Sequence, residues 1–183
     1  MAFDLVFNNP TCNIPKVKDL EREWANVPNP TVRTIVAREH QYLKLHGLLL
    51  MELRHTKDGR AGSPPYKSTL NYNLRAGFIK ATLLVAASIC EAVLRAHAEK
   101  RKYTLPKKKQ RTFGVVLNAW KGKTDLAHLY GDLEALKDIR NNIHLFVAAS
   151  SATGDYKQVL KQEKAMLSDA RRLIDELKKL RSP

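Results

Sequence analysis

The amino-acid sequence predicts a single all-helical domain with a strongly basic surface. The chain has 183 residues, a length that suits one domain with an ordinary core. Apolar residues recur at helical spacing and no run alternates with a period of two, so we expect no sheet. Lys and Arg number 32 against 18 Asp and Glu, and the resulting charge of +14 favours a polyanionic partner, nucleic acid first. The alternative is a basic, soluble surface without such a partner.

The N-terminal part of the chain differs from the rest because four prolines interrupt it. They are Pro10, Pro15, Pro28 and Pro30. Proline has no backbone N–H and breaks regular elements, so residues 1–30 are expected to form an irregular arm with one short helix near residues 16–24.

The helical domain is expected over residues 31–183, and its first helix over residues 31–55. Thr31 is a candidate N-cap for this helix. Its expected core face consists of residues at helical spacing: Ile35, Tyr42, Leu45, Leu49 and Leu53.

The second helix is expected over residues 68–101, after a loop rich in Gly and Pro at residues 57–65. Two adjacent rows of this helix are almost entirely apolar. One row contains Leu74, Phe78, Thr82, Val85, Ile89 and Val93, and the other contains Ile79, Leu83, Ala86, Cys90 and Leu94. A helix that is apolar on two rows belongs in the centre of the core.

Three more helices are expected after a basic loop at residues 103–112. A short helix covers residues 113–120 and ends near Gly122, a fourth covers residues 126–147, and a charged last helix covers residues 155–180.

The fourth helix carries a candidate catalytic pair. At about 100° per residue, Arg140 falls inside the apolar stripe of this helix and His144 at its edge. A buried guanidinium must pair with an acid, reach solvent at an interface or line a polar site. A neutral imidazole can take a proton from a ribose 2′-hydroxyl, while a guanidinium holds the phosphate. The alternative is a structural Arg–Glu pair beside a core histidine.

The segment from Leu133 to His144 (LEALKDIRNNIH) resembles the helix of HEPN domains that ends in L-x-x-x-R-N-x-x-H. The segment from Gly77 to Leu94 (GFIKATLLVAASICEAVL) is similar to the long family helix, in which a run of small residues precedes a glutamate. The order of elements also matches, and the resemblance covers roughly residues 68–178. Three residues separate Arg140 from His144, where the family motif usually has four to six.

This resemblance implies a helical bundle that dimerises through the motif helices and holds a ribonuclease site at the dimer seam. Many family members are toxins or antiviral effectors. By position, Arg140 corresponds to the phosphate-binding arginine, Asn141 to the polar residue that follows it, and His144 to the catalytic histidine. The implied chemistry uses no metal and no cofactor.

Two further features have competing interpretations. Glu91 is expected either to pair with Arg140 and position it or to pair locally with Arg95, four residues away. The basic loop is expected either to bind RNA phosphates or to be a solvated loop. Its candidate RNA-binding residues are Lys100, Arg101, Lys102, Lys107, Lys108, Lys109 and Arg111.

The remaining signals concern location and partners. Cys12 and Cys90 permit at most one disulfide, which fits a reducing compartment, and neither a signal peptide nor a membrane span is expected. The histidines show no metal-ligand spacing. We therefore expect a cytoplasmic RNA endonuclease that forms a homodimer and is controlled by an antitoxin-like or defence partner. The alternatives are a non-catalytic HEPN-like module that binds a protein or nucleotide, and a basic nucleic-acid-binding accessory protein.

Overall fold

The computed structural model describes residues 13–52, 72–107, 110–143 and 154–181, and every regular element in these ranges is helical. The elements are α1 (Val17–Glu23), α2 (Pro30–Glu52), α3 (Tyr72–Lys100), α4 (Phe113–Asn118), a 3-10 turn η3 (Thr124–Leu126), α5 (Tyr130–Asn142) and α7 (Gly154–Leu177). The all-helical prediction is thereby confirmed for the described part of the chain, and each expected helix is present there.

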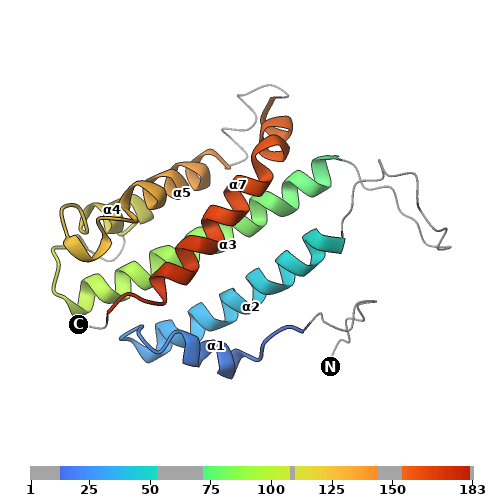
Figure 1. Ribbon diagram of the computed structural model, residues 1–183. Helices are drawn as coiled ribbons and strands as arrows, with labels where there is room; N and C mark the ends of the chain where they lie inside the picture. The colour runs from blue at the N-terminus through green and yellow to red at the C-terminus, as the bar shows by residue number, and fades with distance from the viewer. Residues whose placement is uncertain (1–12, 53–71, 108–109, 144–153, 182–183) are drawn as a thin grey trace.

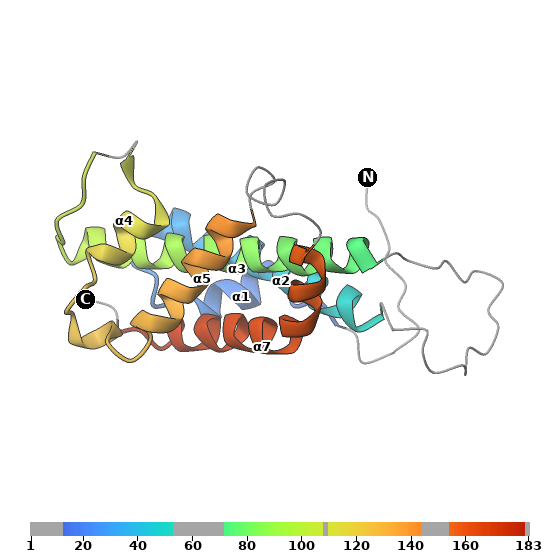
Figure 2. The ribbon, with the colours of Figure 1, turned by 90° about the horizontal axis from the view of Figure 1, so that it is seen from above.

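Helix α3 lies in the middle of the bundle (Figures 1 and 2). It contacts α2, α7, α4 and α5. Five residues of one predicted apolar row are buried: Ile79, Leu83, Ala86, Cys90 and Leu94. The prediction that this helix forms the centre of the core is confirmed.

The same helix is long and apolar enough, by length and composition, to cross a membrane. The segment Arg75–Lys100 contains a window of mean hydropathy 1.8, of which 56% is buried inside the bundle. The sequence expectation that no segment spans a membrane stays a prediction, because length and composition alone do not decide it. The core helix of a soluble protein meets the same criterion.

The N-terminal segment packs into the core from residue 20 onward. Leu20, Trp24 and Val27 are fully buried. The Nε1 of Trp24 donates a hydrogen bond to Nδ1 of His40 at 3.2 Å, and the Nδ2 of Asn26 donates to the backbone oxygen of Leu177 at 2.8 Å. Over residues 13–29, the expected irregular arm is therefore part of the helical domain. The prolines set the ends of helices but do not keep the segment out of the core.

Helix α2 presents a different face to the core from the one expected. Ile35 and Tyr42 are 50% and 59% exposed, whereas Val36, Ala37 and Leu50 are buried. The helix packs against both α1 and α3, which rotates its buried face by one residue. Five of the eight residues from 43 to 50 are leucines, and they lie on more than one face of the helix, so the pattern does not distinguish the two faces.

Helix α5 is shorter than the 126–147 range predicted from the sequence. It begins at Tyr130 because residues 124–126 form the separate turn η3, and it ends at Asn142. Leu133 and Leu136 are buried against the core, as expected. The predicted continuation through His144 and Val147 lies outside the described residues.

Two buried histidines lie in the core. Burial lowers the pKa of His97 to about 4, assisted by the positive charge of Arg101, and neither ring nitrogen has a hydrogen-bond partner among the described residues. Burial also lowers the pKa of His40 to about 4, with smaller contributions from Lys178 and Lys44. The neutral form of His40 accepts the hydrogen bond from Trp24.

We predict that the free energy of unfolding falls as the pH decreases from about 6.5 to 4. The unfolded chain binds more protons than the folded chain in this window, because both folded-state pKa values lie below the ordinary 6.5. Each histidine then contributes a loss of about 1.4 kcal/mol per pH unit. Urea unfolding at several pH values measures this slope, and His97→Leu should reduce it. The matched change at an exposed histidine, His128→Leu, should leave the slope unchanged. Identical slopes in wild type and His97→Leu would show that the pKa of His97 is not lowered by folding.

Candidate functional site

Arg140 lies in the last turn of α5 and reaches across to helix α3. Its Nη2 lies 3.3 Å from Oε2 of Glu91. The Glu91 side chain is 15% exposed and the Arg140 side chain 32% exposed. The apolar stripe of α5 therefore does not bury the guanidinium completely, because Arg140 pairs with an acid and also reaches solvent.

Glu91 holds a second guanidinium with its other oxygen. Nη2 of Arg95 lies 2.8 Å from Oε1 of Glu91 and also donates to the backbone oxygen of Arg111. Both pairings expected from the sequence, Glu91 with Arg140 and Glu91 with Arg95, are thus present together. One carboxylate between two guanidinium groups leaves a net positive charge at this position.

The exposed polar residues next to Arg140 are Asn141 and Asn142, at the carboxyl end of α5. A helix carboxyl end carries partial negative charge, which favours Arg140 there and disfavours an anion. Any phosphate bound at this position would therefore depend on the Arg140 guanidinium. His144 lies outside the described residues, so its distance from Arg140 is not given by the structure.

The candidate RNA-binding cations divide into two groups. Arg101 pairs with Asp125, donates to the backbone oxygen of Arg181 and stacks over the Trp120 ring, 5.4 Å from its centroid. Arg111 pairs with Glu99 and donates from Nε to the backbone oxygen of Pro106 at 2.8 Å. Their side chains are 14% and 16% exposed, and these contacts favour a structural role for both arginines, in which they hold the loop against the bundle. RNA binding by these two residues stays a prediction.

The lysines of the same region remain on the surface. Lys100, Lys102 and Lys107 are exposed, and Lys108 and Lys109 lie outside the described residues. The structure adds Lys121 and Lys123, which are also exposed, and places Nζ of Lys123 4.8 Å from the centroid of the Tyr103 ring. Both lysines flank Gly122, and from the sequence this segment is expected only to end a helix.

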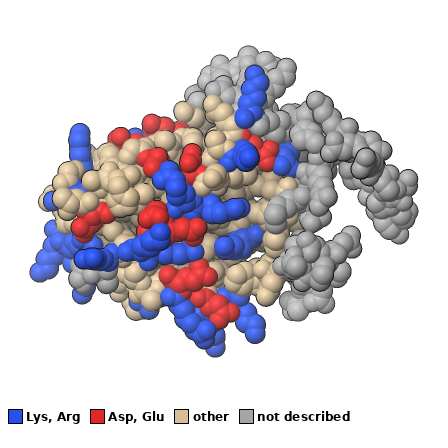
Figure 3. All heavy atoms as spheres, in the orientation of Figure 1, with Lys and Arg blue, Asp and Glu red and all other residues tan. Residues whose placement is uncertain are grey.

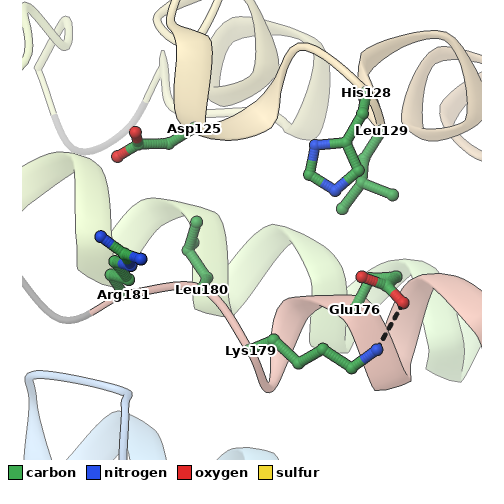
Figure 4. A pocket seen from close by; sticks show the side chains of 7 residues that line it. All are labelled: Asp125, His128, Leu129, Glu176, Lys179, Leu180 and Arg181. Atoms are coloured by element: carbon green, nitrogen blue, oxygen red, sulfur yellow. Dashed lines mark hydrogen bonds and ion pairs between the residues drawn. The ribbon is translucent and has the colours of Figure 1, made fainter.

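A small hollow lies between the turn before α5 and the end of α7 (Figure 4). Three of its charged groups are paired: the Nζ of Lys179 donates to Glu176 at 2.7 Å, and Asp125 binds Arg101. Arg181 also lines the hollow, so one arginine and these two pairs supply its charge. In the part of the chain that the structure describes, no cluster of three or more His, Cys, Asp or Glu side chains has a metal-binding arrangement.

A comparison of the chain with protein-family models, with curated proteins and with solved structures found no match.

We predict that Glu91 and Arg140 are energetically coupled. A double-mutant cycle with Glu91→Gln and Arg140→Gln, followed by urea unfolding, should give a coupling energy of about 1 kcal/mol, because both groups are partly shielded from water. The control cycle is Asp19 with Arg22, an exposed pair at 3.1 Å, for which about 0.3 kcal/mol is expected. A Glu91–Arg140 coupling no larger than that of the control would contradict the pairing.

Proposed function

We propose that this protein is a metal-independent RNA endonuclease of HEPN type that acts in the cytoplasm as a homodimer. The observation that supports it best is the pairing of Arg140 with Glu91, because Glu91 fixes the guanidinium in place at the exposed end of α5. Arg95 shares the same carboxylate, so Arg140 is not fully neutralised and can still attract a phosphate.

The proposed chemistry is attack by the ribose 2′-hydroxyl on the neighbouring phosphorus. His144 removes the proton of the 2′-hydroxyl, and the 2′-oxygen forms a bond to phosphorus. The bond between phosphorus and the 5′-oxygen of the next nucleotide then breaks, and that oxygen gains a proton. Arg140 stabilises the negative charge on the phosphate oxygens. Asn141, exposed beside it, is a second polar contact for RNA.

A second candidate function is RNA binding without cleavage. The exposed lysines at residues 100–123 favour it, because phosphate binding by lysine requires neither His144 nor a dimer seam. In either case an antitoxin-like or defence partner protein is a candidate regulator.

We predict that the wild-type protein cleaves RNA in the presence of EDTA. His144→Ala and Arg140→Ala should each lower the rate by roughly two to four orders of magnitude. Arg140→Lys should restore little activity, because lysine lacks the planar pair of donors. A 2′-deoxy nucleotide at the cut site should block cleavage, and the rate should rise with pH as His144 becomes neutral.

Matched controls separate catalysis from loss of fold. His128→Ala removes an exposed histidine and Arg171→Ala an exposed arginine of α7, and both should retain wild-type rates. Full activity in His144→Ala would show that His144 is not the catalytic base. Loss of cleavage in EDTA would remove the metal-free mechanism, and no cleavage of any RNA by folded protein would favour the second candidate.

We predict that the chain forms a symmetric homodimer with the two α5 helices near the axis. Arg140 is partly exposed and Asn141 and Asn142 beside it are exposed, which leaves the end of α5 accessible to a second copy. Sedimentation at tens of micromolar protein should report twice the mass of 20.8 kDa. A monomer at that concentration would contradict the dimer-seam site.

A further inference from the structure

Residues 99–125 carry half of the net charge of the chain. This stretch contains nine Lys and Arg against two acidic residues, Glu99 and Asp125, an excess of seven within a total of +14. It runs from the last turn of α3 to η3, and Figures 1 and 2 place these segments together at one end of the bundle. Figure 3 shows Lys and Arg side chains projecting at that end, whereas over α7 they mix with Asp and Glu.

Both acids of this region are already neutralised by arginines. Glu99 pairs with Arg111 and Asp125 pairs with Arg101. The remaining described cations are lysines, and no ion pair among the described residues compensates them. These residues, which we name the lysine end, are Lys100, Lys102, Lys107, Lys121 and Lys123, and all five are exposed.

Lys102 adopts a backbone conformation that glycine would adopt more easily. Its φ angle is +55°, and among the described residues it is the only residue other than glycine with a positive φ. It follows the end of α3 in a Schellman-type turn, in which the N–H of Tyr103 donates to the oxygen of Ala98 at 2.9 Å. A lysine at a position suited to glycine has a steric cost, which its positive charge beside the carboxyl end of α3 offsets only in part. That cost is consistent with a role for the side chain in binding.

The aromatic residues of this end are not available to stack on bases. Phe113 and Trp120 are fully buried. The rings of Tyr103 and Trp120 pack nearly perpendicular to each other with centroids 5.1 Å apart, and Nζ of Lys123 lies 4.8 Å from the Tyr103 centroid. Proteins that bind single strands depend on exposed aromatic faces, which are absent among the described residues of this end. The planar guanidinium groups of Arg101 and Arg111 are already paired with Asp125 and Glu99.

We propose that the lysine end binds the phosphate backbone of base-paired RNA without reading its sequence. Five separate point charges from three successive segments match the dense phosphates of a duplex, and neither base stacking nor bidentate base recognition is required. This inference rests on the RNA-binding part of the proposed function and specifies the RNA class. A folded RNA would dock its stem here while an unpaired part reaches Arg140.

The test uses fluorescence anisotropy with the full chain and two 2′-O-methyl RNA probes, which the proposed chemistry cannot cleave. One probe is a hairpin with a 16-base-pair stem, and the other is an unstructured oligouridine with the same number of phosphates. The hairpin should bind at least tenfold more tightly. The triple variant K100Q/K121Q/K123Q should lower hairpin affinity at least tenfold and reduce the slope of log K against log salt by about 0.9 per lysine.

The control variant K16Q/K18Q/K44Q removes the same charge from exposed lysines of the α1 and α2 region and should retain most of the affinity. Lys102→Gly should raise the melting temperature and weaken hairpin binding severalfold, a combination that a purely structural role cannot produce. Equal affinity for the two probes, equal losses in the two triple variants, or unchanged binding in K100Q/K121Q/K123Q would each overturn the proposal. Tight binding of the hairpin probe by a protein that cleaves no unmodified RNA in the separate cleavage assay would support it and refute only the endonuclease function.

Discussion

Helix α3 imposes the main constraint on this fold, because it is apolar on several faces and most of these faces must be covered. Its 29 residues have buried side chains on several faces, and each face packs against a different helix. An isolated helix of this composition would expose far more apolar surface than a soluble chain tolerates. The positions of α2, α4, α5 and α7 follow from this requirement. The N-terminal segment extends the same core through Trp24 and its bond to His40.

The charged residues of α3 are therefore its most informative positions. Glu91 interrupts the apolar run, and a carboxylate there is costly unless it is paired. Glu91 pairs with Arg95 of its own helix and with Arg140 of α5. These two ion pairs connect the candidate site to the core helix of the bundle. Arg95 continues this connection to the backbone of Arg111, at the start of α4. The stability of the fold and the position of Arg140 thus depend on the same carboxylate.

Sequence periodicity predicts the helices and the central position of α3, because a helix with two long apolar rows is stable in water only when both rows are buried. It does not predict the face of α2, since the leucines among residues 43–50 lie on more than one face and the packing of α1 decides the rotation. The sequence also does not separate Arg101 and Arg111 from the neighbouring lysines. All are cations in one loop, and only the positions of Asp125 and Glu99 in space show which are paired. Glu91 could be predicted to pair with either arginine, but its use of both depends on the distance between α3 and α5.

The proposed site requires that Arg140, held by Glu91, contacts an RNA phosphate. NMR of the arginine Nε–Hε groups during titration with a 2′-O-methyl RNA that resists cleavage measures this contact. We expect the Arg140 signal to shift and to saturate at the same RNA concentration as binding measured by anisotropy, and we expect Glu91→Gln to weaken this response. An Arg140 signal that stays unchanged while RNA binding saturates would show that Arg140 does not contact the RNA and that the Glu91–Arg140 pair is a purely structural contact.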